Sequence, residues 1–115
     1  MADLLDRGAR PDAVVCFNDA LALGALHELI RRGVHAPDGI AVIGFVNVEE
    51  TQFSQTTLSS IDPGRSQIAR TVVQMLCERM GMADGFDSAV PPREILVDFE
   101  LVARASTVGV PAFRR

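Results

Sequence analysis

The sequence predicts an α/β fold, a mostly parallel β-sheet flanked by helices. Two short apolar runs, AVVCF at 13–17 and IAVIGF at 40–45, are typical of strands buried on both faces. Helical patterns lie between the predicted strands, and such alternation favours parallel pairing. Nearly half of the 115 residues are apolar, but only six are aromatic, so aliphatic side chains must form most of the core.

The first half of the chain divides at its glycines and prolines. Residues 2–8 resemble the end of a helix, and Pro11-Asp12 separates them from the strand at 13–17. Asn18 or Asp19 can cap a helix over 19–31, which is rich in Ala and Leu and ends before Gly33. The turn at 37–39 then leads into the strand at 40–45.

The second half predicts four further elements. A short acidic helix occupies about 49–54, and a weaker strand follows at 57–61. Asp62 is expected to cap a helix over 63–80, with Pro63 at its first position. After a loop at 81–93, polar and apolar residues alternate over 94–101, which predicts a strand with one wet face. The apolar face of the helix comprises Ile68, Val72, Val73, Met75, Leu76 and Met80.

Charge and composition exclude several classes of function. The formal charge of −4 argues against contact with nucleic acid by this chain, and no apolar run is long enough to span a membrane. Cys16 and Cys77 are expected to be reduced core thiols. No catalytic pair or metal-ligand spacing occurs, and His27 and His35 are expected at the surface, so we predict no enzyme, metal or cofactor. The first residues lack the pattern of a secretory signal, which fits a cytoplasmic protein.

Polar residues follow the predicted strands where each one ends. Asn18 and Asp19 come after the first strand, Asn47 after the second and Asp62 after the third. Ligands of open parallel sheets bind at the carboxyl ends of the strands, and this set suits a polyhydroxylated small molecule. Alternatively, Asn18 and Asp62 are only helix caps and Asn47 is a turn residue.

Four segments in register resemble the LacI/GalR family of transcriptional regulators. They are PDAVVCFNDALALGAL (11–26), GIAVIGFVNVEE (39–50), TLSSID (57–62) and LVARAST (101–107). The resemblance implies a type I periplasmic-binding-protein-like fold of two α/β subdomains, with a sugar, a nucleoside or a similar-sized effector in the cleft. It also implies a homodimer that binds operator DNA through an N-terminal helix-turn-helix.

The resemblance places the chain within that fold. Residues 1–115 would cover most of the second subdomain, with crossovers near 61–63 and 92–95. The helix-turn-helix and the first subdomain would be absent. The helix at 63–80 would then belong with the first subdomain, so its apolar face would need a partner.

The resemblance also implies roles for single residues. Asn18 matches an asparagine of the effector site, Asn47 lies near the cleft and Asp62 lies at a crossover. Family members commonly have an effector-binding aspartate where this chain has Val46, so a strongly hydroxylated sugar is not the expected ligand.

A dimer interface is implied for the helix at 19–31 and the short helix that follows the second strand. Leu23, His27 and Phe53 would lie there, and the apolar character of 20–30 on almost every side agrees with this. The alternative is a helix fully buried within a three-layer domain.

We therefore predict the effector-binding and dimerisation part of a LacI-type repressor controlled by a small molecule. The alternative is a periplasmic solute-binding protein of an ABC transporter, which shares the fold. The coding region upstream distinguishes them, because one requires a helix-turn-helix and the other a signal peptide.

Overall fold

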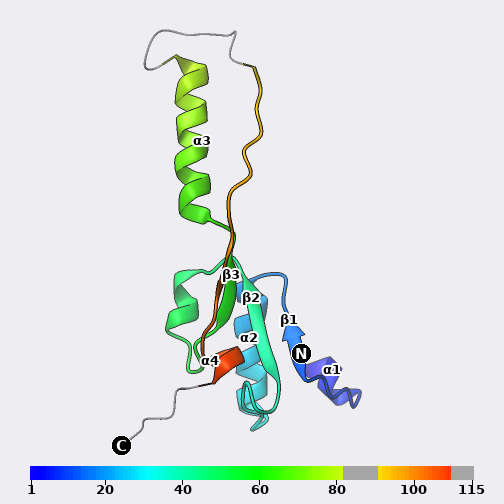
Figure 1. Cartoon of the computed structure of the whole chain (residues 1–115). Helices are drawn as coiled ribbons and strands as arrows, with labels where there is room; N and C mark the ends of the chain where they lie inside the picture. Colours follow the sequence, from blue (N-terminus) through cyan, green and yellow to red (C-terminus); the bar gives the residue numbers. More distant parts are fainter. Residues whose placement is uncertain (82–90, 110–115) are drawn as a thin grey trace, which may run out of the picture. The chain divides into compact units, whose positions relative to one another are not determined.

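The computed structural model describes residues 1–81 and 91–109, which form two compact units (Figure 1). The first unit comprises residues 1–62 and the segment from Glu100 onwards, and the second comprises residues 63–99. The first contains α1 (Ala2–Asp6), β1 (Ala13–Val15), α2 (Asp19–Arg31), β2 (Ala41–Phe45), the 3-10 helix η1 (Glu49–Gln52), β3 (Ser59–Asp62), β4 (Glu100–Val102) and α4 (Ala105–Val108). The second contains α3 (Arg65–Met80).

The first unit is built on a four-stranded sheet in the order β1-β2-β3-β4. β1 pairs with β2 and β2 with β3 in parallel, whereas β4 runs antiparallel to β3. The predicted α/β fold with a mostly parallel sheet is confirmed. Because β1, β2 and β3 run in the same direction, their carboxyl ends lie at one edge of the sheet, where the polar residues were expected.

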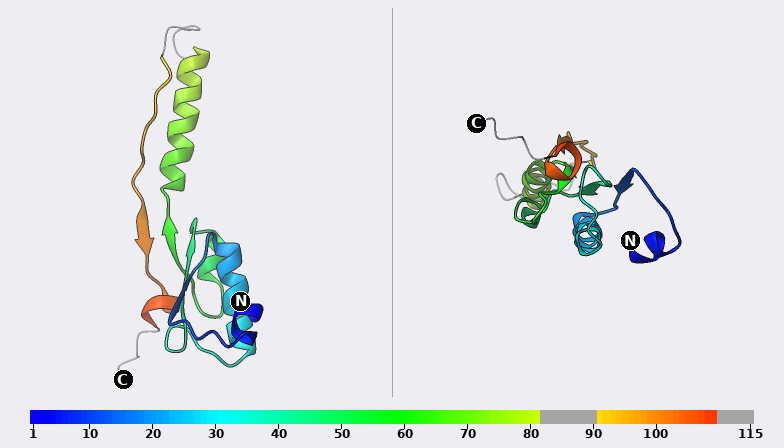
Figure 2. Two further views of the ribbon diagram at one scale, coloured as in Figure 1. Left: turned by 90° about the vertical axis from the view of Figure 1, so that its right-hand side faces the viewer. Right: turned by 90° about the horizontal axis from the view of Figure 1, so that it is seen from below.

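Helix α2 packs on this sheet through one stripe of small and aliphatic residues. Ala22, Leu26 and Leu29 recur at helical spacing and form a buried core with Ile40 and Val42, together with Leu58. Figure 2 shows α1 on the same side of the strands as α2. The opposite side of α2 is not covered by the described chain, since Leu21 and His27 are exposed.

The first strand is shorter and more exposed than the sequence predicted. It ends at Val15 rather than at residue 17, and Val15 and Phe17 are 80% and 93% exposed. Among the described strands, β1 pairs only with β2 and is therefore an edge strand. The prediction that both faces of this strand are buried was wrong, because nothing in the described chain covers the side chains of Val15 and Phe17.

The start of α3 also differs from the prediction. Asp62 is the last residue of β3, and α3 begins at Arg65 behind Gly64, which has φ +79° and provides no side-chain cap. A residue before proline is disfavoured in the α conformation, so Pro63 keeps Asp62 extended. Asp62 as a helix cap with Pro63 in the first turn was therefore wrong.

The predicted strand at 94–101 is reduced to β4, Glu100–Val102. Pairing with β3 extends only from Ser60 to Asp62, and a strand needs a partner to continue its ladder. The apolar faces of the second unit are exposed in the described chain. They include Ile95, Leu96 and Phe99 and, on α3, Ile68, Val72, Val73, Leu76 and Met80.

Candidate functional site

A tight turn at 46–48 follows the carboxyl end of β2. Val46 has φ 107° and Asn47 has φ 58°, so two consecutive residues other than glycine have positive φ. Asparagine tolerates this region, but for a β-branched residue such as valine it is strained. The surrounding structure must hold the turn in place.

Three consecutive backbone amides of the turn donate hydrogen bonds to neighbouring elements. Val46 N donates to Ile61 O at 2.9 Å, Asn47 N to Ser60 Oγ at 3.0 Å and Val48 N to Asp19 Oδ2 at 2.7 Å. Two of these acceptors belong to β3 and the third to the first residue of α2. These bonds connect the turn to two elements that are distant in sequence.

Asp19 is the buried centre of this arrangement. It is only 1% exposed, and its second oxygen, Oδ1, accepts a hydrogen bond from Ser60 Oγ at 2.6 Å. Both carboxylate oxygens therefore have partners within the chain. Gly44 makes room for it, because a Cβ there would lie 2.2 Å from Asp19 Oδ1.

The side chain of Asn47 bridges two charged groups. Its Oδ1 accepts from Arg104 Nη2 at 2.8 Å, and its Nδ2 donates to Asp62 Oδ2 at 3.0 Å. Arg104 also donates through Nη1 to Thr51 Oγ1 at 3.0 Å and Leu58 O at 2.8 Å. One guanidinium thus joins η1, the approach to β3 and the turn.

Asn18 is the exposed member of the predicted set. Its Oδ1 accepts from Leu21 N at 2.9 Å, so it is the N-cap of α2, as one alternative held. Its side chain lies beside the carboxyl end of β1, and a capping asparagine still has two N–H donors. Capping and ligand binding are therefore compatible at this position.

The structure connects most of the predicted site residues in one hydrogen-bonded network. Ser60 Oγ joins Asp19 to the backbone of Asn47, Asn47 bonds directly to Asp62, and half-buried Val46 lies in the same turn. Ser60, Gly44 and Arg104 also take part in this arrangement, although no local pattern in the sequence points to their chemistry. Arg104 lies in the segment LVARAST, whose signal in the sequence is its resemblance to the family.

The three residues predicted at a dimer interface lie in or near one groove of about 370 Å³. Leu23 and His27 line it from α2, and residues 54–56 line it from the segment after η1. Leu23 is half-buried, His27 is exposed and Phe53, the residue before this segment, is 77% exposed. The alternative of a fully buried α2 does not fit the described chain.

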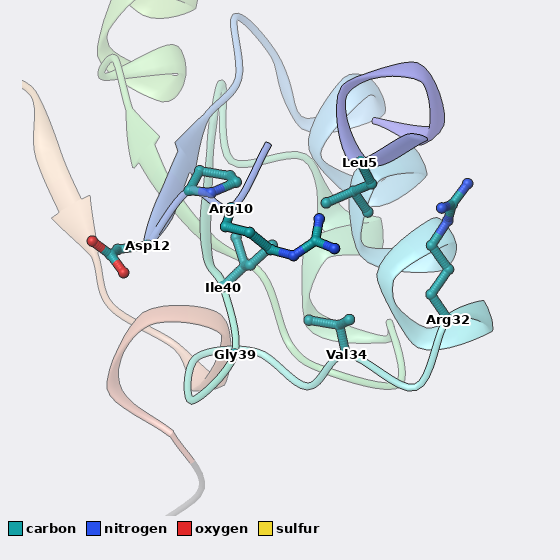
Figure 3. A pocket seen from close by; sticks show the side chains of 8 residues that line it. Leu5, Arg10, Asp12, Arg32, Val34, Gly39 and Ile40 are labelled. Carbon is teal, nitrogen blue, oxygen red and sulfur yellow. The ribbon is translucent and has the colours of Figure 1, made fainter. Parts of the chain in front are cut away.

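A second cavity, of about 400 Å³, lies at the opposite end of the sheet (Figure 3). Asp12 and Ile40, just before β1 and β2, line it, and Figure 3 shows the Arg10 side chain extending between Leu5 and Val34. Arg32, also in its lining, pairs with Asp6 at 2.8 Å and Glu28 at 2.6 Å.

The Arg32 guanidinium holds the pKa of both carboxyls below their usual range, mainly by hydrogen bonding. Because the cavity lies at the amino ends of β1 and β2, it is not the expected ligand position in an open parallel sheet.

Residues 1–81 and 91–109 offer neither a cluster for a metal ion nor a helix that could cross a membrane. No group of three or more His, Cys, Asp or Glu side chains there could hold a metal ion. No helix in that part of the chain is long and apolar enough to cross a bilayer.

Comparison with known proteins identifies the family. Residues 1–107 match the model of the periplasmic binding protein-like domain. The chain is 38% identical over 112 residues to the HTH-type transcriptional repressor CytR of Escherichia coli K12, covering 96% of this chain and 31% of that protein. It therefore spans about a third of the length of this curated relative.

Solved structures agree with this match. A LacI-type transcription regulator from Bifidobacterium animalis subsp. lactis is 46% identical with a TM-score of 0.79, over 90% of this chain and 35% of that one. The lac repressor dimer bound to operator and the anti-inducer ONPF is 26% identical with a TM-score of 0.75. This match covers 91% of the present chain and 35% of the repressor chain. The chain therefore belongs to the periplasmic binding protein-like domain family, and within it to the effector-binding domain of LacI-type transcriptional regulators.

Proposed function

We propose that this chain is the effector-binding and dimerisation part of a cytoplasmic LacI-type repressor. The effector would bind beside the carboxyl ends of β1, β2 and β3. The observation that carries this proposal is the strained turn at 46–48, whose three amides are all held by hydrogen bonds at that edge. Strained backbone that is held so firmly is typical of ligand sites. The first subdomain and the operator-binding helix-turn-helix would lie outside residues 1–115.

The proposed site divides its residues between contact and support. Asn18 and Val46 would face the ligand, because Asn18 is exposed and Val46 leads the turn. Asp19, Asn47 and Asp62 would instead support the turn through the hydrogen-bonded network described above. We propose a sugar, a nucleoside or a similar small metabolite, with Val46 disfavouring many hydroxyl groups at that position.

The first prediction concerns Val46. Val46→Asp would supply a carboxylate that accepts from ligand hydroxyls, and one such bond contributes about 1.5–3 kcal/mol. We expect affinity for a hexose to rise by about tenfold or more, since tenfold corresponds to roughly 1.4 kcal/mol. Calorimetry on the intact regulator with a hexose, a pentose and a nucleoside would measure this.

A second variant reports on Asn18 in the same assay. Asn18→Asp retains the acceptor for Leu21 N, and hence the cap, but removes both N–H donors. We expect it to weaken whichever compound binds. Tight hexose binding by the unmodified protein, unchanged in both variants, would place the site elsewhere.

The second prediction concerns the homodimer. We propose that Leu23, His27 and Phe53 lie at its interface, because Leu23 and His27 line one groove, and exposed Phe53 directly precedes Ser54, which lines it too. Buried aromatic residues at interfaces often contribute 2 kcal/mol or more. Phe53→Asp is therefore expected to raise the dimer dissociation constant by at least about tenfold in sedimentation velocity.

The chain offers a matched control for that experiment. Phe17 is even more exposed than Phe53 but lies after β1, away from the groove. Phe17→Asp should leave the dimer intact. Equal effects of the two substitutions, or none from Phe53→Asp, would contradict the proposed interface.

A further inference from the structure

Arg104 follows β4, yet its guanidinium contacts three segments that are far from it in sequence. Nη1 donates to Thr51 Oγ1 and Leu58 O, and Nη2 donates to Asn47 Oδ1. The backbone at Arg104 is anchored as well, because its N–H donates to Ser59 Oγ at 2.7 Å. Both the base and the tip of the side chain are therefore held.

This anchoring determines how the amide of Asn47 is oriented. A guanidinium only donates hydrogen bonds, so the group facing Arg104 must be Oδ1. Nδ2 then faces the carboxylate of Asp62, and an ionised carboxylate accepts hydrogen bonds but donates none. Charged partners on both sides select one of the two amide orientations, and they connect the turn to the last residue of β3.

Asn47 is also the residue whose backbone must stay in the left-handed region next to strained Val46. Its backbone N–H relies on Ser60 Oγ, a single neutral hydrogen bond. The two bonds of its side chain involve charged partners, and such bonds are roughly twice as strong as neutral ones. The side chain is therefore the main restraint on this residue.

We propose that Arg104 is a positioning residue for the effector site: it acts through Asn47 to hold the turn at 46–48 in its strained conformation. Arg104 itself does not contact the ligand. This inference rests on the proposed function for the meaning of the site, but its contacts lie entirely within the described chain.

Arg104→Lys tests the fork geometry while keeping the positive charge. An ammonium on a flexible stem does not reproduce a planar fork that reaches three acceptors in fixed directions. Amide hydrogen exchange, measured by NMR on the intact protein without ligand, should become at least about tenfold faster at Asn47 and Val48. Exchange at Val42, in the middle of β2, should stay the same.

Arg31→Lys is the matched control. Arg31 pairs with Glu28 on the exposed surface of α2. This variant should therefore leave amide exchange unchanged at Asn47, Val48 and Val42. A purely structural role of Arg104 would accelerate exchange at Val42 together with the turn. That result, or an unchanged turn, would overturn the proposal.

A polarity swap provides rescue. Asn47→Asp keeps the acceptor for Arg104 but sets a second carboxylate against Asp62, so exchange in the turn should accelerate. Adding Asp62→Asn restores a donor and an acceptor with reversed direction and should return exchange to near its original rate. Asp62→Asn alone measures the effect on the other contacts of Asp62. Exchange in the double variant as fast as in Asn47→Asp alone would contradict the relay through Asn47.

The outcomes separate this inference from the proposed function. Faster exchange in the turn of Arg104→Lys, with no compound of the panel bound by the parent protein, would support Arg104 as an anchor and refute the effector site. Binding by the parent protein, with affinity and exchange in the turn both unchanged in Arg104→Lys, would refute the positioning role alone.

Discussion

Replacing Asp19 with alanine is expected to lower the free energy of unfolding by roughly 3–5 kcal/mol. The carboxylate is 1% exposed and accepts from Ser60 Oγ and Val48 N, and each such charge-assisted bond contributes about 1.5–3 kcal/mol. Alanine would leave both donors buried beside a small void. Urea unfolding, followed by circular dichroism, would measure the change.

Two variants define what that loss means. Asp3→Ala removes a carboxylate whose ion pair with Arg7 is mostly exposed, so its effect should stay below about 1 kcal/mol. Asp19→Asn retains one acceptor oxygen and should fall between the parent and Asp19→Ala. If Asp19→Ala were as mild as Asp3→Ala, Asp19 would not be the support of the turn.

Gly44→Ala is expected to cost at least about 2 kcal/mol, although it adds a single methyl group. The added Cβ would lie 2.2 Å from Asp19 Oδ1 and 3.2 Å from Asp19 Cα, so both β2 and the start of α2 would have to shift. Overpacking of this kind costs typically about 1–3 kcal/mol, and displacement of Asp19 would weaken its two hydrogen bonds as well. The same unfolding measurement applies.

Gly24→Ala is the matched control and should have the opposite sign. Gly24 lies in the middle of α2 on its exposed surface, and a Cβ there would have no other atom within 4 Å. Alanine in a helix interior is favoured over glycine by about 0.8–1 kcal/mol, so the protein should become more stable. Destabilisation by Gly24→Ala would mean that this face of α2 is covered in the intact protein.

Combining the two substitutions tests whether they act at one place. In the Asp19→Ala background the atom nearest to the new Cβ is absent, so Gly44→Ala should cost less than it does in the parent protein. Residues in contact commonly show coupling of about 0.5–3 kcal/mol. Additive effects would show that the strain at Gly44 is relieved elsewhere.

The class of the fold follows from patterns in the sequence alone. Apolar β-branched runs identified β1 and β2, and a capping residue followed by an Ala- and Leu-rich stretch that ends before Gly33 identified α2. Local signals suffice here because a strand or helix is recognised from neighbouring residues. They also placed Asn18, Asp19 and Asn47 after the predicted strands, whereas only the family resemblance points to Val46.

Which side chains meet depends on contacts between residues that are far apart in the sequence. Asp19 and Ser60 are 41 residues apart, and Arg104 and Asn47 are 57 apart, so no local pattern signals their hydrogen bonds. The positive φ of Val46 could not be predicted either, because valine disfavours it and hydrogen bonds from residues distant in sequence hold the turn. The length of β4 also depends on a distant segment. The alternating pattern covers eight residues, 94–101, but a strand extends only as far as its partner, and β3 ends at Asp62, so β4 has three residues.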